Sequence, residues 1–180
     1  MKDIVLVTTT RYDSTRDTRF LLTVKMAEDA RAEGFSLVVV DSSPDEDVRK
    51  HLTERGAHVF LEMAETKMGK GVALRQAIQQ AVAFNPLVIM FLEPEKYELI
   101  EDIARIAQPI LAGDALIVVP RRNTTSWKSY PREQYPLEHL PETLDWKPFR
   151  HEFVDLQWGE TYDLSKPIPV VVDEGFFLEF

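Results

Sequence analysis

The feature that most constrains the fold is an alternation, over residues 1–119, of short apolar runs with stretches long enough to be helices. The apolar runs are rich in β-branched residues and lie at positions 4–8, 35–40, 58–61, 87–92 and 116–119. Continuous apolar runs are typical of strands buried on both faces, as in parallel sheets covered by helices. The pattern therefore predicts an α/β fold, a three-layer sandwich with a mostly parallel central sheet.

Two local signals predict where the first helices begin. Ser14 with Asp17, three residues on, can cap a helix that follows the first strand. After the second strand, Ser43 is followed by Pro44 and, three positions on, by Glu46. This is the order of a capping box with proline at the first helical position. We therefore expect Ser43 to cap the second helix.

Two further helices are expected in the second half of the alternating region. A third begins near Gly69-Lys70-Gly71 and carries Leu74 and Ile78 on its inward face. A fourth is expected as a single helix over about residues 95–110, because its apolar residues recur at helical spacing.

The composition changes after residue 119. Seven of the 11 prolines and all three tryptophans fall between positions 120 and 169. This aromatic content argues against a disordered tail. We expect a single domain over residues 1–180, in which residues 1–122 form the α/β half. Residues 123–180 would then be a covering segment that ends in strands near 168–173 and 175–180.

The acidic charge balance restricts the partners of the chain. The 21 Lys and Arg residues stand against 30 Asp and Glu, a net charge of -9, which disfavours nucleic acid and anionic membranes as partners. The absence of cysteine excludes disulfides, thiolate catalysis and sulfur-ligated zinc. No apolar run reaches the roughly 18 residues of a membrane span, and no signal-peptide pattern is present. We therefore expect a cytoplasmic protein without a transmembrane segment.

Polar residues follow the predicted strands at the point where each strand ends. Ligands of open parallel sheets bind outside these carboxyl ends. The residues concerned are Thr8, Thr9, Thr10 and Arg11 after the first strand, Asp41 and Ser43 after the second, Glu93 and Glu95 after the fourth, and Arg121 and Arg122 after the fifth. Their gathering at one edge predicts a charged ligand. The alternative for Asp41 and Ser43 is that they only cap the next helix.

Glycines exclude some nucleotide-binding motifs and suggest another. No glycine precedes Gly34, so the glycine fingerprint of a dinucleotide site is absent after the first strand. Gly69-Lys70-Gly71 lacks the flanking residues of a P-loop. At a helix start, however, it would expose backbone N–H groups beside a lysine, which suits a phosphate or pyrophosphate. The alternative is a tight turn with a solvated lysine.

Glu93 and Glu95 are candidate metal ligands. Two carboxylates two residues apart at the end of a buried strand can reach one divalent cation, and oxygen ligands suit Mg²⁺ or Mn²⁺. The alternative is that they are acids at a helix N-terminus, with Pro94 in the first turn. Near the C-terminus, Asp173 and Glu174 could supply a catalytic base, or they could form a charged turn between two strands.

In order and spacing, these pieces resemble the nucleotide-binding half of a GT-A glycosyltransferase, of the family 2 and dolichol-phosphate-mannose-synthase type. The resemblance covers roughly residues 3–122. It is carried by Thr8-Thr9-Thr10-Arg11, by the strand ending in Asp41-Ser42-Ser43, by Gly69-Lys70-Gly71-Val72-Ala73-Leu74-Arg75, by the strand leading to Glu93-Pro94-Glu95, and by Val118-Val119-Pro120-Arg121-Arg122. The family's D-x-D metal motif is E-P-E here.

The resemblance implies a GT-A fold and the transfer of a sugar from a nucleotide-diphospho-sugar to an acceptor that the sequence does not identify. Asp41 and the loop Thr8-Thr9-Thr10-Arg11 would hold the nucleoside. Lys70, with Arg121 or Arg122, would hold the pyrophosphate. Glu93 and Glu95 would hold the metal, and Asp173 or Glu174 would be the base. Two other hypotheses stay open: a nucleotide-binding or scaffold protein that keeps this fold without catalysis, and a different phosphate-handling enzyme on a similar sheet.

Overall fold

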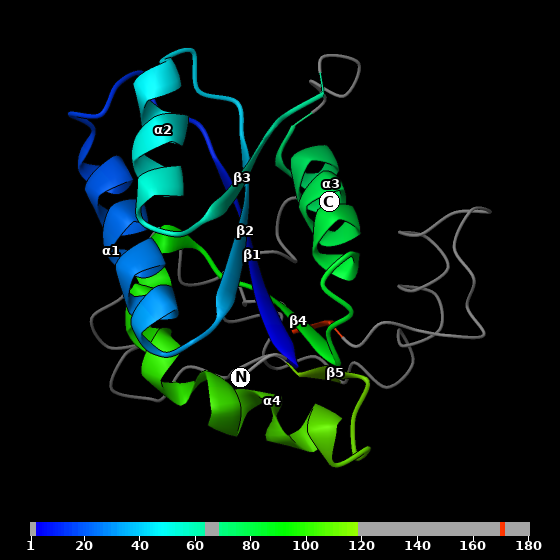
Figure 1. Ribbon diagram of the computed structural model, residues 1–180. Helices are drawn as coiled ribbons and strands as arrows, with labels where there is room; N and C mark the ends of the chain where they lie inside the picture. The colour runs from blue at the N-terminus through cyan, green and yellow to red at the C-terminus, as the bar shows by residue number, and fades with distance from the viewer. Residues whose placement is uncertain (1–2, 64–68, 119–169, 172–180) are drawn as a thin grey trace, which may run out of the picture. The chain divides into compact units, whose positions relative to one another are not determined.

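The computed structural model describes residues 3–63, 69–118 and 170–171, which belong to one compact unit (Figure 1). Its sheet has six strands in the order β3-β2-β1-β4-β6-β5, and neighbouring strands pair in parallel. The strands are β1 (Ile4–Thr10), β2 (Ser36–Asp41), β3 (His58–Leu61), β4 (Val88–Phe91), β5 (Ile117–Val118) and β6 (Val170–Val171). The prediction of an α/β fold around a parallel sheet is confirmed.

Helices cover both faces of this sheet (Figure 1). On one face lie α1 (Thr18–Ala32), α2 (Glu46–Glu54), the 3₁₀ helix η2 (Pro94–Asp102) and α4 (Ile103–Leu111), and on the other lies α3 (Lys70–Val82). α1 contacts both α2 and η2, while α3 packs across β1 and β2. The two faces therefore have separate cores.

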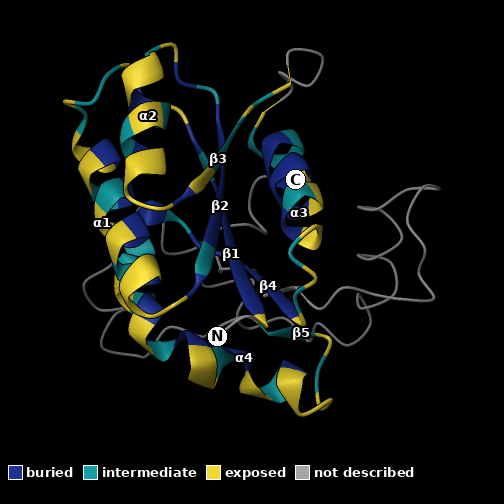
Figure 2. Ribbon diagram, in the orientation of Figure 1, coloured by how far each residue is buried: buried dark blue, intermediate teal, exposed yellow. Residues whose placement is uncertain are grey.

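The central strands are buried on both faces, as their continuous apolar runs predict (Figure 2). Leu6, Leu37 and Met90 belong to the core that the strands form with α1, α2, η2 and α4. Because side chains alternate along a strand, the residues between them face α3. On α3, Leu74 and Ile78 are buried, as expected from their spacing. The sheet is thus a well-packed platform for the loops at its edges.

Of the two residues expected to cap α1, Ser14 and Asp17, the N-cap is Asp17. Its side chain accepts a hydrogen bond of 2.8 Å from the backbone N–H of Arg19. Phe20 and Ala27 are buried on the inward face of the helix. The chain leaves the helix at Gly34, whose φ of +77° is a conformation that glycine adopts without strain.

The capping box predicted for α2 is wrong. The N-cap is Asp45, whose side chain accepts a hydrogen bond of 3.0 Å from the backbone N–H of Asp47, so Pro44 precedes the helix. Ser43 instead donates its hydroxyl hydrogen to the buried carboxylate of Asp41 at 2.6 Å. A buried charge without hydrogen bonds would cost more free energy than a missing cap, which explains why Ser43 serves the carboxylate.

The single fourth helix predicted over residues 95–110 is also wrong. The chain forms η2 and then α4, with non-helical backbone angles at Lys96 (φ -109°, ψ 22°). Pro94, Ile100 and Ile103 are buried, and Tyr97 packs against the same core. These four positions recur every three residues, which matches the three residues per turn of a 3₁₀ helix.

Several predictions fall wholly or partly beyond the described residues. The fifth predicted strand is present as β5, and β6 lies within the strand expected near residues 168–173. The covering segment, Arg121, Arg122, Asp173 and Glu174 otherwise lie outside the part of the chain that the structure describes. Within that described part, no helix combines the length and the apolar character needed to cross a bilayer.

The reassigned cap of α2 can be tested by mutation. We expect Asp45→Ala to lower the free energy of unfolding by about 1 kcal/mol, because the first turn loses its cap. Glu46→Ala should change it by less than about 0.5 kcal/mol, since the Glu46 side chain is 92% exposed. Urea denaturation of both variants measures the difference. A larger loss for Glu46→Ala than for Asp45→Ala would instead support the capping box.

Candidate functional site

The strand order indicates where a ligand would bind. From β1 the chain runs outward through β2 to β3 and then crosses to β4 on the other side of β1 (Figure 1). The strand order therefore reverses between β1 and β4. Open α/β sheets bind ligands outside the carboxyl ends of the strands at such a reversal.

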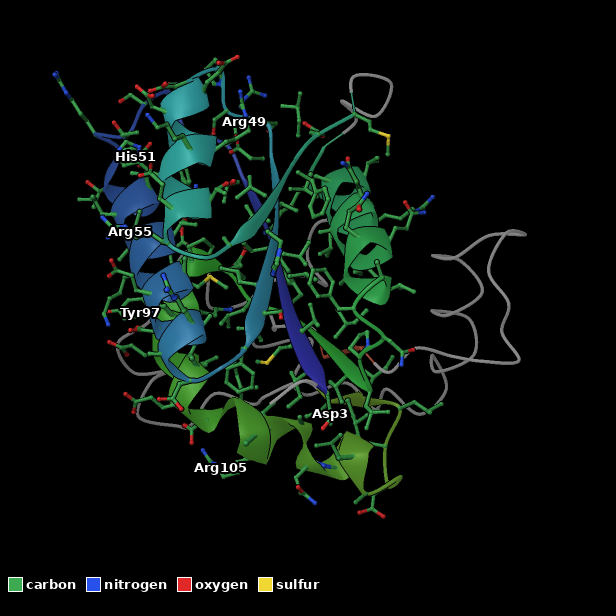
Figure 3. The ribbon with its side chains drawn as sticks, viewed as in Figure 1. Asp3, Arg49, His51, Arg55, Tyr97 and Arg105 are labelled. Carbon is green, nitrogen blue, oxygen red and sulfur yellow. The ribbon has the colours of Figure 1, made fainter. Side chains whose placement is uncertain are left out.

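Asp41, the last residue of β2, is completely buried, and its carboxylate accepts four hydrogen bonds. Oδ1 accepts from the hydroxyls of Thr10 at 2.8 Å and Ser43 at 2.6 Å. Oδ2 accepts from the backbone N–H of Ser43 at 3.2 Å and from Nη1 of Arg49 at 3.1 Å. Arg49 lies on α2, at the end of the sheet where β2 terminates (Figure 3). Two bonds on each oxygen fill the acceptor capacity of a carboxylate.

These bonds make Asp41 the centre of a closed network. A ligand could donate a hydrogen bond to Asp41 only if Thr10, Ser43 or Arg49 withdrew. The interpretation of Asp41 and Ser43 as caps of α2 is wrong, because Asp45 is the cap. Contact between Asp41 and a nucleoside stays a prediction, while its structural role in joining β1, β2 and α2 is observed.

The same network anchors the loop after β1. Ser43 Oγ accepts a hydrogen bond of 2.9 Å from the backbone N–H of Tyr12. The Tyr12 hydroxyl lies 2.6 Å from the Thr23 hydroxyl on α1, and burial raises the pKa of Tyr12 above its ordinary value. Tyr12 is therefore a neutral, fixed side chain at neutral pH. Arg11, immediately before it, is exposed.

The three threonines predicted to touch a ligand differ in exposure. Thr8 is buried, and its hydroxyl has no hydrogen-bond partner among the residues that the structure describes. Thr9 is half-buried, and Thr10 is buried and bound to Asp41. Of the predicted loop residues, Arg11 is thus the one most accessible to a ligand.

A second group of charges lies after β4. Glu93 forms an ion pair with Lys70 at the start of α3, and Nζ of Lys96 lies 3.8 Å from the other carboxylate oxygen of Glu93. Glu95 forms an ion pair with Arg19 in the first turn of α1. We call Arg19, Lys70, Glu93, Glu95 and Lys96 the edge charge cluster. It joins α1, α3 and η2 outside the carboxyl ends of β1 and β4.

The members of the edge charge cluster influence one another. The hydrogen bond to Glu95 raises the pKa of Arg19 above its ordinary value, and the charges of Glu95 and Glu93 add to this effect. Nζ of Lys70 also lies 5.6 Å from the ring centroid of Phe91, the last residue of β4. Over the described residues, the cluster gathers three cationic side chains and two carboxylates. Its cationic side chains are suited to an anionic ligand.

The carboxylates of this cluster do not fit a shared Mg²⁺ or Mn²⁺ ion in the arrangement observed. Each carboxylate is bound to a cationic side chain of its own, Glu93 to Lys70 and Glu95 to Arg19. A divalent cation would have to displace these side chains. Over residues 3–63, 69–118 and 170–171, no group of three or more His, Asp or Glu side chains is arranged to hold a metal.

The structure brings together part of the predicted site. Lys70, Glu93 and Glu95 belong to one cluster, and Gly69 is the N-cap of α3 with a φ of +102°. Lys96 belongs to the run Glu93-Pro94-Glu95-Lys96 that follows the fourth predicted strand, but the sequence did not suggest Arg19 and Arg49 as members of the two networks. A usable signal existed for the two arginines, because both lie in the first turns of helices that follow strands and therefore start at the carboxyl edge.

Mutation of Asp41 tests its structural role. We expect Asp41→Asn to lower the free energy of unfolding by about 3 kcal/mol, because Arg49 loses its buried counter-charge and the amide NH₂ group cannot accept the hydrogen bonds that one carboxylate oxygen accepts. The exposed Asp13, in the loop after β1, offers a control. Asp13→Asn should change stability by less than about 0.5 kcal/mol in the same urea titration. An Asp41→Asn variant of unchanged stability that no longer bound nucleotides would assign Asp41 to the ligand.

Comparisons with known proteins leave the function to be argued from this geometry. No model of a protein family matches the chain. A search of curated proteins and a search of solved structures also find no match.

Proposed function

We propose that this protein binds a nucleotide-diphospho-sugar at the carboxyl ends of β1 and β4 and transfers its sugar, as a GT-A glycosyltransferase does. The observation that carries the proposal is the position of Lys70. This lysine opens α3 and meets Glu93 where the strand order reverses. A fixed cation at this point of a parallel sheet is suited to a phosphate group. The order of motifs that resembles the family gives independent support.

The start of α3 adds to the support for a diphosphate. Gly69 is the N-cap of α3, and no side chain in the described part of the chain caps the helix. The positive end of the helix dipole and the first backbone N–H groups attract anions. In the proposal, the diphosphate lies against Lys70 and the first turn of α3. The exposed Arg11 reaches the nucleoside from the loop after β1.

The Asp41 network has a supporting role in this proposal. Its hydrogen bonds to Thr10, Ser43 and Arg49 hold the ends of β1 and β2, and the Tyr12 backbone N–H fixes the loop that carries Arg11. A loop fixed before the ligand arrives loses less conformational entropy on binding.

The transfer reaction itself requires a base and a stabilised leaving group. The hydroxyl oxygen of the acceptor substrate forms a bond to the anomeric carbon as the bond from that carbon to the diphosphate breaks. Lys70 stabilises the charge that develops on the diphosphate. The hydroxyl proton passes to a carboxylate, for which we propose Asp173 or Glu174. Arg121 and Arg122 stay candidates for additional phosphate contacts.

A second candidate function is nucleotide binding without catalysis. The ion pairs of Glu93 and Glu95 favour it, because both carboxylates that the resemblance assigns to a metal are bound to cationic side chains. A protein of this kind would bind the same ligand and release no sugar.

Binding measurements with UDP, GDP and their sugars test the proposal. We expect at least one of these ligands to bind in isothermal titration calorimetry. Lys70→Ala should weaken that affinity by about 10- to 100-fold, since a hydrogen bond to a charged group contributes about 1.5–3 kcal/mol. Lys50→Ala, at an exposed lysine of α2, is the matched control and should leave the affinity unchanged.

Three outcomes distinguish the hypotheses. Binding accompanied by release of the nucleoside diphosphate supports the glycosyltransferase. Binding with neither hydrolysis nor transfer supports the second candidate. If no nucleotide or nucleotide sugar binds, or if Lys70→Ala binds as tightly as the unmodified chain, the proposed site is wrong.

A further inference from the structure

We propose that the edge charge cluster binds the diphosphate of its ligand without a divalent metal, with Lys70 and Arg19 supplying the positive charge that a metal would supply. This inference rests on the proposed function, and it concerns how the site recognises the phosphates. The resemblance implies a metal at Glu93 and Glu95, but both carboxylates form ion pairs with cationic side chains instead. This difference points to a phosphate site that uses no metal.

Both carboxylates of the edge charge cluster are bound to cationic side chains. Glu93 contacts Lys70 through Oε1, and its Oε2 lies 3.8 Å from Nζ of Lys96. Both oxygens of Glu93 thus face ammonium groups. Glu95 is bound to Nε of Arg19. A divalent ion would have to displace at least one of these cations and would then remain next to the others, which repel it.

Three members of the edge charge cluster are largely shielded from water. The side chains of Lys70, Glu93 and Lys96 are 31%, 24% and 21% exposed, so water screens these charges only in part. Repulsion between a metal and nearby cations is stronger where screening is weak. Attraction between the same cations and a diphosphate is strengthened for the same reason.

Arg19 is the cluster member that a ligand can reach most easily. Its side chain is 64% exposed, and it belongs to the first turn of α1. A guanidinium group can bind phosphate oxygens in a two-pronged geometry that an ammonium group cannot form. Arg19 is therefore accessible to a phosphate, and in the proposal it binds one phosphate of the ligand while Lys70 binds the other.

The two carboxylates then have a different role from metal ligands. In the protein without ligand, Glu93 and Glu95 hold Lys70 and Arg19 in position through ion pairs. The phosphates replace these carboxylates as partners of the cations when the ligand binds. Glu93 thus competes with the ligand for Lys70, whereas a metal ligand would assist binding.

The test is calorimetric titration of the full chain with UDP and GDP, once in excess EDTA and once with Mn²⁺ or Mg²⁺. We expect the affinity in EDTA to lie within about threefold of the affinity with metal. Affinity that falls tenfold or more in EDTA would overturn this inference and leave the proposed function standing. Absence of binding in every buffer would overturn the proposed function and this inference with it.

Charge variants provide an independent arm of the test. We expect Glu93→Gln to bind UDP or GDP roughly threefold more tightly, because Lys70 loses its internal competitor. Glu54→Gln, at the exposed far end of α2, should leave the affinity unchanged. Circular dichroism establishes that each variant is folded. Equal or weaker binding by Glu93→Gln would overturn the inference.

The lysine variants complete this arm. Lys70→Met keeps the length of the side chain and removes its charge, so it should weaken binding in EDTA at least tenfold. Lys70→Arg keeps the charge and should retain most of the affinity. If Lys70→Met bound as tightly as the unmodified chain, Lys70 would not be the phosphate partner.

Discussion

The parallel pairing of the strands is the constraint on which the rest of this structure depends. Because neighbouring strands run in the same direction, their carboxyl ends meet at one edge, and the residues that follow each strand are gathered there. This edge receives a fully buried carboxylate at the end of β2, Asp41, which needs hydrogen bonds to be stable there. Thr10, Ser43 and Arg49 supply them, and in doing so they fix the loop after β1 and displace the start of α2 to Asp45.

The two polar groups at this edge differ in what they can do. The carboxylate of Asp41 is buried and already accepts four hydrogen bonds, so this network favours rigidity over exchange with a ligand. The edge charge cluster is partly exposed, and its most exposed ion pair, between Arg19 and Glu95, can exchange partners at little cost because exposed pairs contribute at most about 1 kcal/mol. We therefore propose that an anionic ligand is recognised between β1 and β4, with the neighbouring end of β2 as a rigid support.

Local sequence signals predicted the local features of this fold. They failed where contacts between residues far apart in the sequence determine the structure. The strand positions and the Asp17 cap were predictable because each depends on neighbours in the chain. The cap of α2 was not, because Ser43 satisfies a carboxylate that is buried by packing elsewhere. The ion pair between Arg19 and Glu95 joins residues 76 positions apart, and no local pattern signals such a pairing. The 3₁₀ geometry of η2 was readable in principle from apolar residues that recur every three positions.

The most direct test of the central claim is an NMR titration of the ¹⁵N-labelled chain with UDP and GDP, which reports every backbone amide that a ligand approaches. The account predicts that the largest shifts occur at Arg11, Lys70 and Glu93, at the carboxyl ends of β1 and β4. A separate cavity of about 500 Å³, lined by residues of α1 and η2 that include Lys25 and Tyr97, serves as an internal comparison. Shifts centred on that cavity, or at the amino ends of the strands, would contradict the account.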